Sequence, residues 1–340
     1  MNMSENGEPI AMGFQAVAGQ SKAKQMLQSA IRRNSVSHAY LFAGPPGTGR
    51  KAAALAFAQT LFCSSGGDDA CGQCLACRKF EHGNEPDFHV ITPDGASIKI
   101  DQIRDLQREL SYRAAETKRK IYMMEHAEKM TPQAANGLLK FLEEPNSPVV
   151  AILITDNPHA VLPTIRSRSQ QVPFLPVSHQ EMLETLLKDG QPELAARAAV
   201  HLASGLEGCR ALIQQEGFAE TRNVVIQLGK DSLGRFPSAI VTAGQYLAKG
   251  GLGERPEQLI ALLSLWYKDL LYVQAGRRDR VVYIDQIDWL GKHAFTRPPE
   301  AWVAAIELVL ETGKRIRAHV SPQLAMEQFL VKLQEGIVLV

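Results

Sequence analysis

Short runs of apolar residues alternate with longer helical patterns over the first half of the chain. The helical segments have apolar residues at helical spacing, as between Gln20 and Arg33, or strong helix propensity, as in KAAALAFAQTLF. The apolar runs are typical of buried parallel strands. They predict five strands, at residues 38–44, 87–93, 121–124, 149–157 and 170–174. Because strands and helices alternate, the sequence predicts an α/β domain with a parallel sheet.

The strand pattern fades after the segment PFLPVS, residues 173–178, which is the first candidate linker. Residues 178–216 suggest three short helices, and the remainder of the chain to Val340 is helical too. The sequence therefore predicts an α/β part followed by an all-helical part.

Length and composition bound the class of protein. A chain of 340 residues suggests two or three domains. A composition with 45% hydrophobic and 21% charged residues is typical of a soluble globular protein. The formal net charge of +1 does not indicate nucleic-acid binding by the whole molecule, so any basic surface would be local. No run of 18 apolar residues occurs, and the polar N-terminal segment MNMSENGEP lacks the features of a secretory signal. We therefore expect a cytoplasmic protein.

The segment GPPGTGRK follows the first predicted strand and is close to the Walker A pattern G-x-x-x-x-G-K-[ST]. Its glycines would let backbone N–H groups approach phosphate oxygens at a helix N-terminus. In a working loop, a lysine reaches the β- and γ-phosphates and a Ser or Thr hydroxyl ligates Mg²⁺. Here an arginine and a lysine stand at those two positions. The candidate residues of this degenerate nucleotide site are Gly44, Gly47, Thr48, Gly49, Arg50 and Lys51.

The end of the third predicted strand is also altered. An ATPase of this type would have Asp-Glu here, with the Asp for magnesium and the Glu to polarise water, whereas this chain has Glu125 and His126. Glutamate can still contact the ion, but histidine poorly replaces a carboxylate base. The sequence therefore predicts no intrinsic ATP hydrolysis and leaves open whether nucleotide binds without hydrolysis. An ordinary strand–helix turn is the alternative interpretation of the loop.

Four of the five cysteines crowd together after the helix that follows the loop. Their spacing is C-x₇-C-x₂-C-x₂-C, at Cys63, Cys71, Cys74 and Cys77. In a cytosolic chain this clustering indicates metal binding before disulfides. Four thiolates can close around zinc tetrahedrally and leave no open position for a catalytic water, so we predict a structural zinc module at about residues 63–80. Four unrelated thiols are the alternative.

The segment TIRSRSQ, residues 164–170, places Arg166 and Arg168 just beyond the fourth predicted strand. Taken alone, this pattern is typical of a solvated helix end. The wider stretch from Lys120 to Gln170 changes that interpretation, because it resembles the clamp-loader branch of the AAA+ ATPases. AANGLLKFLEEP and LPTIRSRSQ are the most specific portions. With the four-cysteine insertion, the chain resembles subunits of the bacterial replicative clamp loader, densely over residues 14–176 and diffusely afterwards.

This resemblance implies three domains and a role in trans. The domains would be an AAA+ α/β domain over residues 1–175, a helical lid over 176–217 and a helical collar over 218–340 that closes a five-subunit ring. The segment SRS at 167–169 matches the family's Ser-Arg-Cys motif, whose arginine reaches the neighbouring subunit's ATP site. A serine replaces the cysteine here, but Arg168 is intact.

The resemblance also implies partners, namely the tau/gamma and delta clamp-loader subunits, with the sliding clamp and primed DNA met through the complex and no membrane. The chain would then serve in DNA replication as part of the DNA polymerase III holoenzyme, without ATPase activity of its own.

Two rival functions remain. An active tau/gamma-type clamp-loader ATPase would keep the loop lysine and the Asp-Glu pair, which are missing here. A stand-alone zinc-bearing DNA-binding protein would need a basic, aromatic-rich surface, which the net charge of +1 does not support. The length, the altered motifs and the C-terminal SPQLAMEQFL favour a clamp-loader subunit other than the motor.

Overall fold

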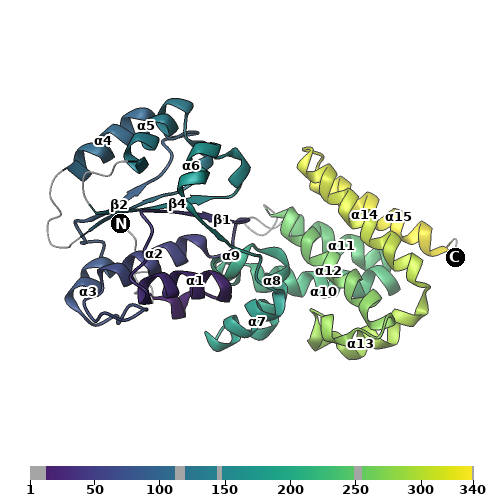
Figure 1. The fold of residues 1–340 in the computed structure, drawn as a ribbon. Helices are drawn as coiled ribbons and strands as arrows, with labels where there is room; N and C mark the ends of the chain where they lie inside the picture. The colour runs from purple at the N-terminus through teal and green to yellow at the C-terminus, as the bar shows by residue number, and fades with distance from the viewer. Residues whose placement is uncertain (1–12, 112–118, 144–147, 249–254, 339–340) are drawn as a thin grey trace. The chain divides into compact units, whose positions relative to one another are not determined.

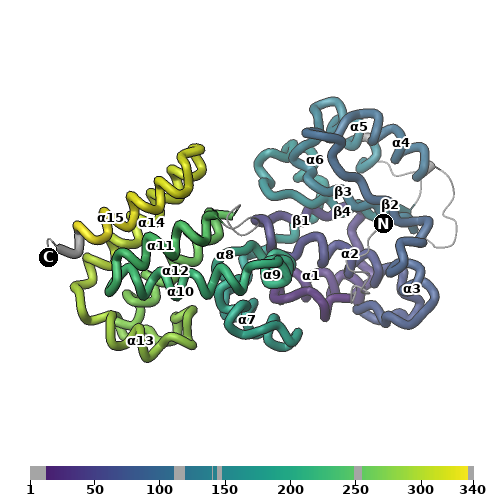
Figure 2. The backbone as a smooth tube through the Cα atoms, turned by 180° about the vertical axis from the view of Figure 1, so that it is seen from behind, coloured from purple at the N-terminus to yellow at the C-terminus, as the bar shows by residue number. Residues whose placement is uncertain are grey.

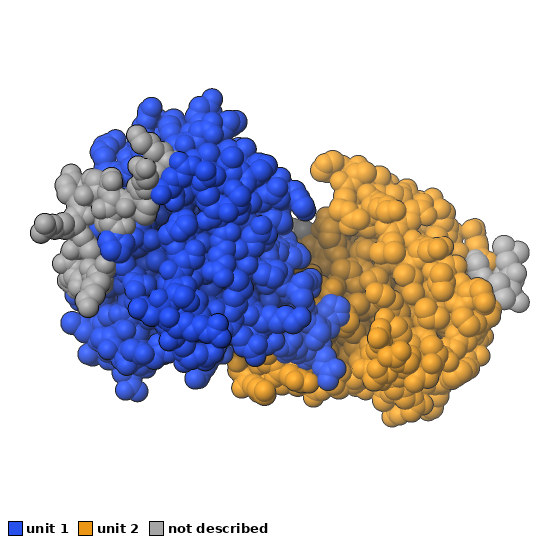
Figure 3. Space-filling model, viewed as in Figure 1, with its two compact units in different colours: residues 1–181 blue, residues 182–340 orange. Residues whose placement is uncertain are grey.

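The computed structural model describes residues 13–111, 119–143, 148–248 and 255–338. The chain divides into two compact units, residues 1–181 and 182–340 (Figure 3). Among the described helices, none combines the length and the apolar character that crossing a membrane would require.

The first unit is built around a five-stranded sheet of order β2-β3-β4-β1-β5, in which every neighbouring pair is parallel. The prediction of a parallel α/β domain is therefore confirmed, and each strand lies at a predicted apolar run. The strands are β1 (Ala39–Ala43), β2 (Phe88–Ile91), β3 (Lys120–Met124), β4 (Val149–Thr155) and β5 (Gln170–Pro173).

Helices cover both faces of this sheet (Figure 1). One face carries α1 (Ser21–Arg32), α2 (Arg50–Phe62) and α3 (Leu75–Glu81), and the other carries α4 (Ile100–Ser111), α5 (Pro132–Glu143) and α6 (Pro163–Arg168). Short 3₁₀ turns complete the unit at η1 (Phe14–Ala16), η2 (Ala127–Lys129) and η3 (Pro158–Ala160).

The alternation of side chains along β1 explains the two-layer core. Tyr40 and Phe42 pack with the α1 and α2 side, whereas Leu41 between them packs with the α4, α5 and α6 side. Ala43 at the end of β1 pairs in register with Thr155 at the end of β4. The loop after β1 and the residues after β4 therefore meet at one edge of the sheet.

In the second unit, the described secondary structure is helical. The three short helices expected between residues 178 and 216 are α7 (His179–Lys188), which crosses the boundary between the units, α8 (Glu193–Leu202) and α9 (Gly205–Gln214). The longer helices are α10 (Phe218–Gly234), α11 (Phe236–Ala248), α12 (Pro256–Gln274), α14 (Pro299–Arg317) and α15 (Pro322–Val338), with the short α13 (Ile287–His293) and the turns η4 (Arg278–Arg280), η5 (Ile284–Gln286) and η6 (Ala294–Thr296) between them.

Helix α12 is central to the second unit, since it packs on α10 and α14, and α14 and α15 lie side by side in both views (Figures 1 and 2). The indole rings of Trp266 and Trp302 are fully buried there. Burying aromatic side chains of this size contributes a large share of the apolar stabilisation of a helical unit.

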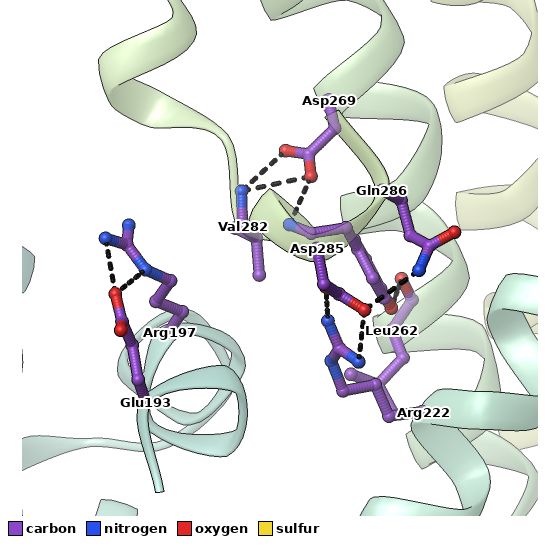
Figure 4. A network of polar contacts seen from close by, with 9 residues as sticks. Glu193, Arg197, Arg222, Leu262, Asp269, Val282, Asp285 and Gln286 are labelled. Carbon is purple, nitrogen blue, oxygen red and sulfur yellow. Dashed lines mark hydrogen bonds and ion pairs between the residues drawn. The ribbon is translucent and has the colours of Figure 1, made fainter. Parts of the chain in front are cut away.

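A buried carboxylate joins α12 to the segment before α13 (Figure 4). Asp269 has no exposed surface, and it accepts hydrogen bonds from the backbone N–H groups of Val282 at 3.0 Å and Tyr283 at 2.7 Å. Arg222 of α10 pairs with Asp285 and lies over the Tyr283 ring, 4.9 Å from its centroid. Burial raises the pKa of Asp269 to about 7, although the two backbone hydrogen bonds oppose that shift.

Candidate functional sites

Glycines set the backbone conformation of the loop between β1 and α2. Gly47 and Gly49 have φ angles of 76° and 77°, a left-handed conformation that side chains rarely adopt. At Gly44, a Cβ atom would lie 2.4 Å from the carbonyl oxygen of Phe174, so only glycine fits. Thr48 is buried, and its hydroxyl donates to the Pro45 carbonyl at 2.9 Å. The conformation of this loop therefore depends on its glycines.

Arg50, which stands at the lysine position of the Walker A pattern, is buried and hydrogen-bonded within the protein. Arg50 is 7% exposed, and its guanidinium donates to the carbonyl of Thr155 and, at 2.5 Å, to a carboxylate oxygen of Asp156. This contact exists because β1 and β4 are neighbours and end at the same edge of the sheet. In a working loop the side chain at this position would contact a phosphate, whereas here the Arg50 guanidinium is paired with groups at the end of β4.

The next residue is paired in the same manner. The Lys51 ammonium lies 2.8 Å from a carboxylate oxygen of Glu125, directly after β3. Lys51 is half exposed, whereas the Glu125 side chain is 18% exposed. The two positions that would together hold Mg²⁺ in an active site therefore neutralise each other, which opposes binding of the ion.

His126 adopts a left-handed conformation, with φ of 54°, and its Nδ1 atom lies 3.2 Å from Glu128 and 4.0 Å from Asp156. Ligand atoms of these three residues all lie within 4.8 Å of one another, a spacing that could suit a metal ion. The contact between Arg50 and Asp156 places a guanidinium against one carboxylate, which weakens the attraction for a cation. Sequence reasoning missed Glu128, four residues after the third predicted strand, and Asp156, which fell inside the fourth predicted strand and directly follows the observed β4.

Arg168 lies at the last position of α6, which covers the sheet face opposite the one covered by α2 (Figure 1). It donates to the Thr164 carbonyl at 3.2 Å and lies 2.5 Å from a Glu143 carboxylate oxygen, while its side chain stays 39% exposed. Arg166 instead lies 3.5 Å from the His159 ring. Among the described residues, no polar contact joins Arg168 to the loop at residues 44–51, so the structure does not bring these predicted site residues together.

The four predicted metal ligands are brought together as one cluster. The sulfur atoms of Cys63, Cys71, Cys74 and Cys77 lie within 4.8 Å of one another. Cys71 is 4.0 Å from Cys77, and Cys74 is 4.0 Å from Cys63. A tetrahedral zinc site with Zn–S bonds of about 2.3 Å places its sulfurs about 3.8 Å apart, so the arrangement fits the metal.

Local backbone geometry supports the thiolate form in part of the four-cysteine cluster. Burial opposes ionisation of Cys74, but hydrogen bonds from Ser64 and from the Cys77 backbone N–H lower the pKa of its thiol to about 5. Burial raises the pKa of the Cys77 thiol. A metal ion would offset that burial cost, because its charge holds the bound sulfur deprotonated.

The four-cysteine cluster is joined to the main core on two sides. Phe80, on the helix α3 that follows Cys74, packs into the cluster of buried side chains below the sheet. Asp69, between Cys63 and Cys71, accepts the backbone N–H of Phe14 at 2.8 Å. The module therefore also fixes the start of the N-terminal segment at Phe14.

A family model described as "DNA polymerase III, delta subunit" matches residues 19–178. Over nearly the whole length of both chains, the sequence is similar to the DNA polymerase III subunit delta' of Bacillus subtilis (strain 168), with 36% identity over 93% of this chain and 97% of that protein. The chain belongs to the delta' subunits of DNA polymerase III, in the clamp-loader family.

Similarity extends more weakly to the subunit named tau of the same organism. Its DNA polymerase III subunit tau is 28% identical over 94% of this chain, and the match covers 61% of that protein. Among solved structures, a DNA polymerase III gamma subunit-related protein of Thermotoga maritima is matched over 92% of this chain and 99% of that one, with a TM-score of 0.38 and 18% identity. The higher identity with subunit delta', and the larger share of that protein that is matched, decide between the delta' and tau subunits.

Proposed function

We propose that this chain serves in the clamp loader of DNA replication as a partner that supplies an arginine to a neighbouring subunit's ATP site and hydrolyses no ATP itself. The observation that carries the proposal is a contrast between two arginines. Arg50, at the chain's own loop, is buried and bound to Asp156, whereas Arg168 is partly exposed on the other face of the sheet. An exposed guanidinium at a helix end can reach a phosphate on another subunit.

The chemistry of such a group is electrostatic. A guanidinium delivered to the γ-phosphate stabilises the charge that develops as the phosphoryl group is transferred. Fingers of this kind contribute roughly 10³–10⁵ in rate in GTPases. A ring with several ATP sites would show a smaller overall effect, because only one site would face this subunit.

The alternative, a tau/gamma-type ATPase, is disfavoured by the two ion pairs of the loop. Binding ATP and Mg²⁺ productively would require Arg50 to leave Asp156 and Lys51 to leave Glu125. Even then, His126 would stand where a carboxylate should polarise the attacking water.

We further propose that the four-cysteine cluster holds one structural zinc ion. Zinc bound by four thiolates would supply no open coordination position and hence no chemistry beyond cross-linking the module. We also propose that residues 176–217 form the lid and residues 218–340 the collar through which the chain joins its ring with the tau/gamma and delta subunits. The sliding clamp and primed DNA would be met through that complex.

The test is clamp loading onto primed DNA by a complex reconstituted with wild-type tau/gamma and delta subunits. Arg168→Ala should leave the complex assembled, as judged by its mass, and should lower the loading rate. Arg166→Ala is the matched control and should be milder, since its guanidinium is directed toward His159. Full loading activity with Arg168→Ala would reduce this subunit to a scaffold and would remove the proposed role in trans.

A further inference from the structure

The guanidinium of Arg168 is held at two points although it lies at the surface. One nitrogen donates to the carbonyl of Thr164, four residues earlier on α6, at 3.2 Å. The other terminal nitrogen lies 2.5 Å from a carboxylate oxygen of Glu143, the last residue of α5. A guanidinium carries five N–H donors in a rigid plane, so two contacts fix its orientation and leave donors available.

The position of Glu143 is set by the core beneath it. Its neighbour Leu142 and Ile165 of α6 are both buried in the cluster on that side of the sheet. Because these side chains pack α5 against α6, the carboxylate at the end of one helix stays next to the guanidinium at the end of the other. The contact does not depend on a loop.

We propose that Glu143 is a positioning residue for Arg168, holding the guanidinium in the orientation that a neighbouring subunit's phosphate would meet. The inference rests on the proposed function of Arg168. Both side chains are partly exposed, at 39% for Arg168 and 49% for Glu143, so the pair can accept a third partner without burying a charge. An arginine free to sample all its rotamers would present the productive orientation only part of the time.

A competing role for the same contact makes the opposite prediction. If the carboxylate competed with phosphate for the guanidinium, removing it would speed ATP turnover. If it positions the guanidinium, removing it slows turnover. The sign of the effect therefore separates the two roles.

The experiment uses the reconstituted complex with wild-type tau/gamma and delta subunits, and it measures kcat and KM for ATP with DNA and clamp present. Glu143→Ala should lower kcat by about two- to fivefold, the range that loss of an exposed ion pair gives, with KM unchanged. KM should hold because the neighbour's own loop binds the nucleotide. Glu143→Gln keeps an acceptor oxygen and should recover part of the loss. Gln133→Ala, at an exposed position on the first turn of α5, is the matched control and should equal wild type.

A double-variant comparison excludes a merely structural effect. In an Arg168→Ala background, Glu143→Ala should cause no further loss, because its only route to the ATP site has gone. A further loss in that background, an unchanged kcat with Glu143→Ala alone, or a raised kcat would each overturn the positioning role. No loss with Arg168→Ala would instead overturn the proposed function, and the inference with it.

Discussion

Truncating Arg50 should destabilise the first unit far more than truncating its neighbour Lys51. Arg50 is almost fully buried, and Arg50→Ala would leave Asp156 without its cation. Breaking a fully buried ion pair costs about 3–5 kcal/mol, but the Asp156 side chain is 34% exposed and would regain water. The carbonyl of Thr155 would keep the backbone N–H of Gly44 as a partner, at 3.3 Å. We therefore expect a loss of about 2–3 kcal/mol, in line with hydrogen bonds to charged groups.

The pair of Lys51 and Glu125 provides an internal control. Lys51 is half exposed, so Lys51→Ala should cost at most about 1 kcal/mol. Both variants change the same turn of α2, and they differ mainly in the burial of the charge. A double-variant cycle of Arg50→Ala with Asp156→Asn should give a coupling energy of at least about 1 kcal/mol.

The assay can separate the two units, because all three tryptophans, Trp266, Trp289 and Trp302, lie in the second unit. Tryptophan fluorescence during urea unfolding therefore follows that unit, while far-UV circular dichroism follows both. With a slope of about 2 kcal/mol per M, Arg50→Ala should lower the midpoint of the first unit by about 1 M and leave the fluorescence midpoint in place. Equal, small shifts of the first unit's urea midpoint for Arg50→Ala and Lys51→Ala would refute a stabilising role of the buried contact between Arg50 and Asp156.

Two further predictions concern zinc and pH. The purified, reduced protein should contain about one equivalent of zinc, and Cys77→Ser should abolish tight binding; less than a tenth of an equivalent in a folded protein would contradict the metal site. Because the pKa of Asp269 is about 7 in the folded protein against an ordinary 3.8, the folded state binds the extra proton between these values. This contribution to stability is full below about pH 4 and is lost as the pH rises to about 7, by at most about 1.4 kcal/mol per pH unit. The fluorescence midpoint should therefore fall between pH 5.5 and 7.5 more steeply in the wild type than in Asp269→Asn, and equal slopes would show that Asp269 does not titrate there.

The sheet and the four-cysteine cluster could be predicted from sequence for local reasons. The interior strands β1 and β4 are nearly continuous apolar runs because their side chains are buried on both faces of the sheet. The cysteine spacing is typical of a four-thiolate metal site, and the structure brings the four sulfurs within reach of one ion. The turn after β1 was recognisable from its glycines, since Gly47 and Gly49 adopt left-handed backbone conformations.

The ion pairs that neutralise Arg50 and Lys51 in the loop could not be predicted in this way. The contact between Arg50 and Asp156 spans 106 positions in sequence, and it depends on β1 lying beside β4. The contact between Glu143 and Arg168 joins the ends of two helices whose relative placement is set by packing. The sequence shows Asp269 as an acidic residue within an apolar helical stretch, which indicates a buried carboxylate. It does not show which groups bind that carboxylate, because the backbone N–H donors come from a separate segment.

We propose that this chain acts on ATP in trans and not at its own loop. The most direct measurement is DNA- and clamp-stimulated ATP turnover by the reconstituted complex, with either Arg168→Ala or Glu125→Gln in this subunit. We expect Arg168→Ala to lower turnover and Glu125→Gln to leave it unchanged, and we expect the isolated chain to hydrolyse no ATP above background. A turnover that falls with Glu125→Gln and is unaffected by Arg168→Ala would show that the chain acts at its own loop and not in trans.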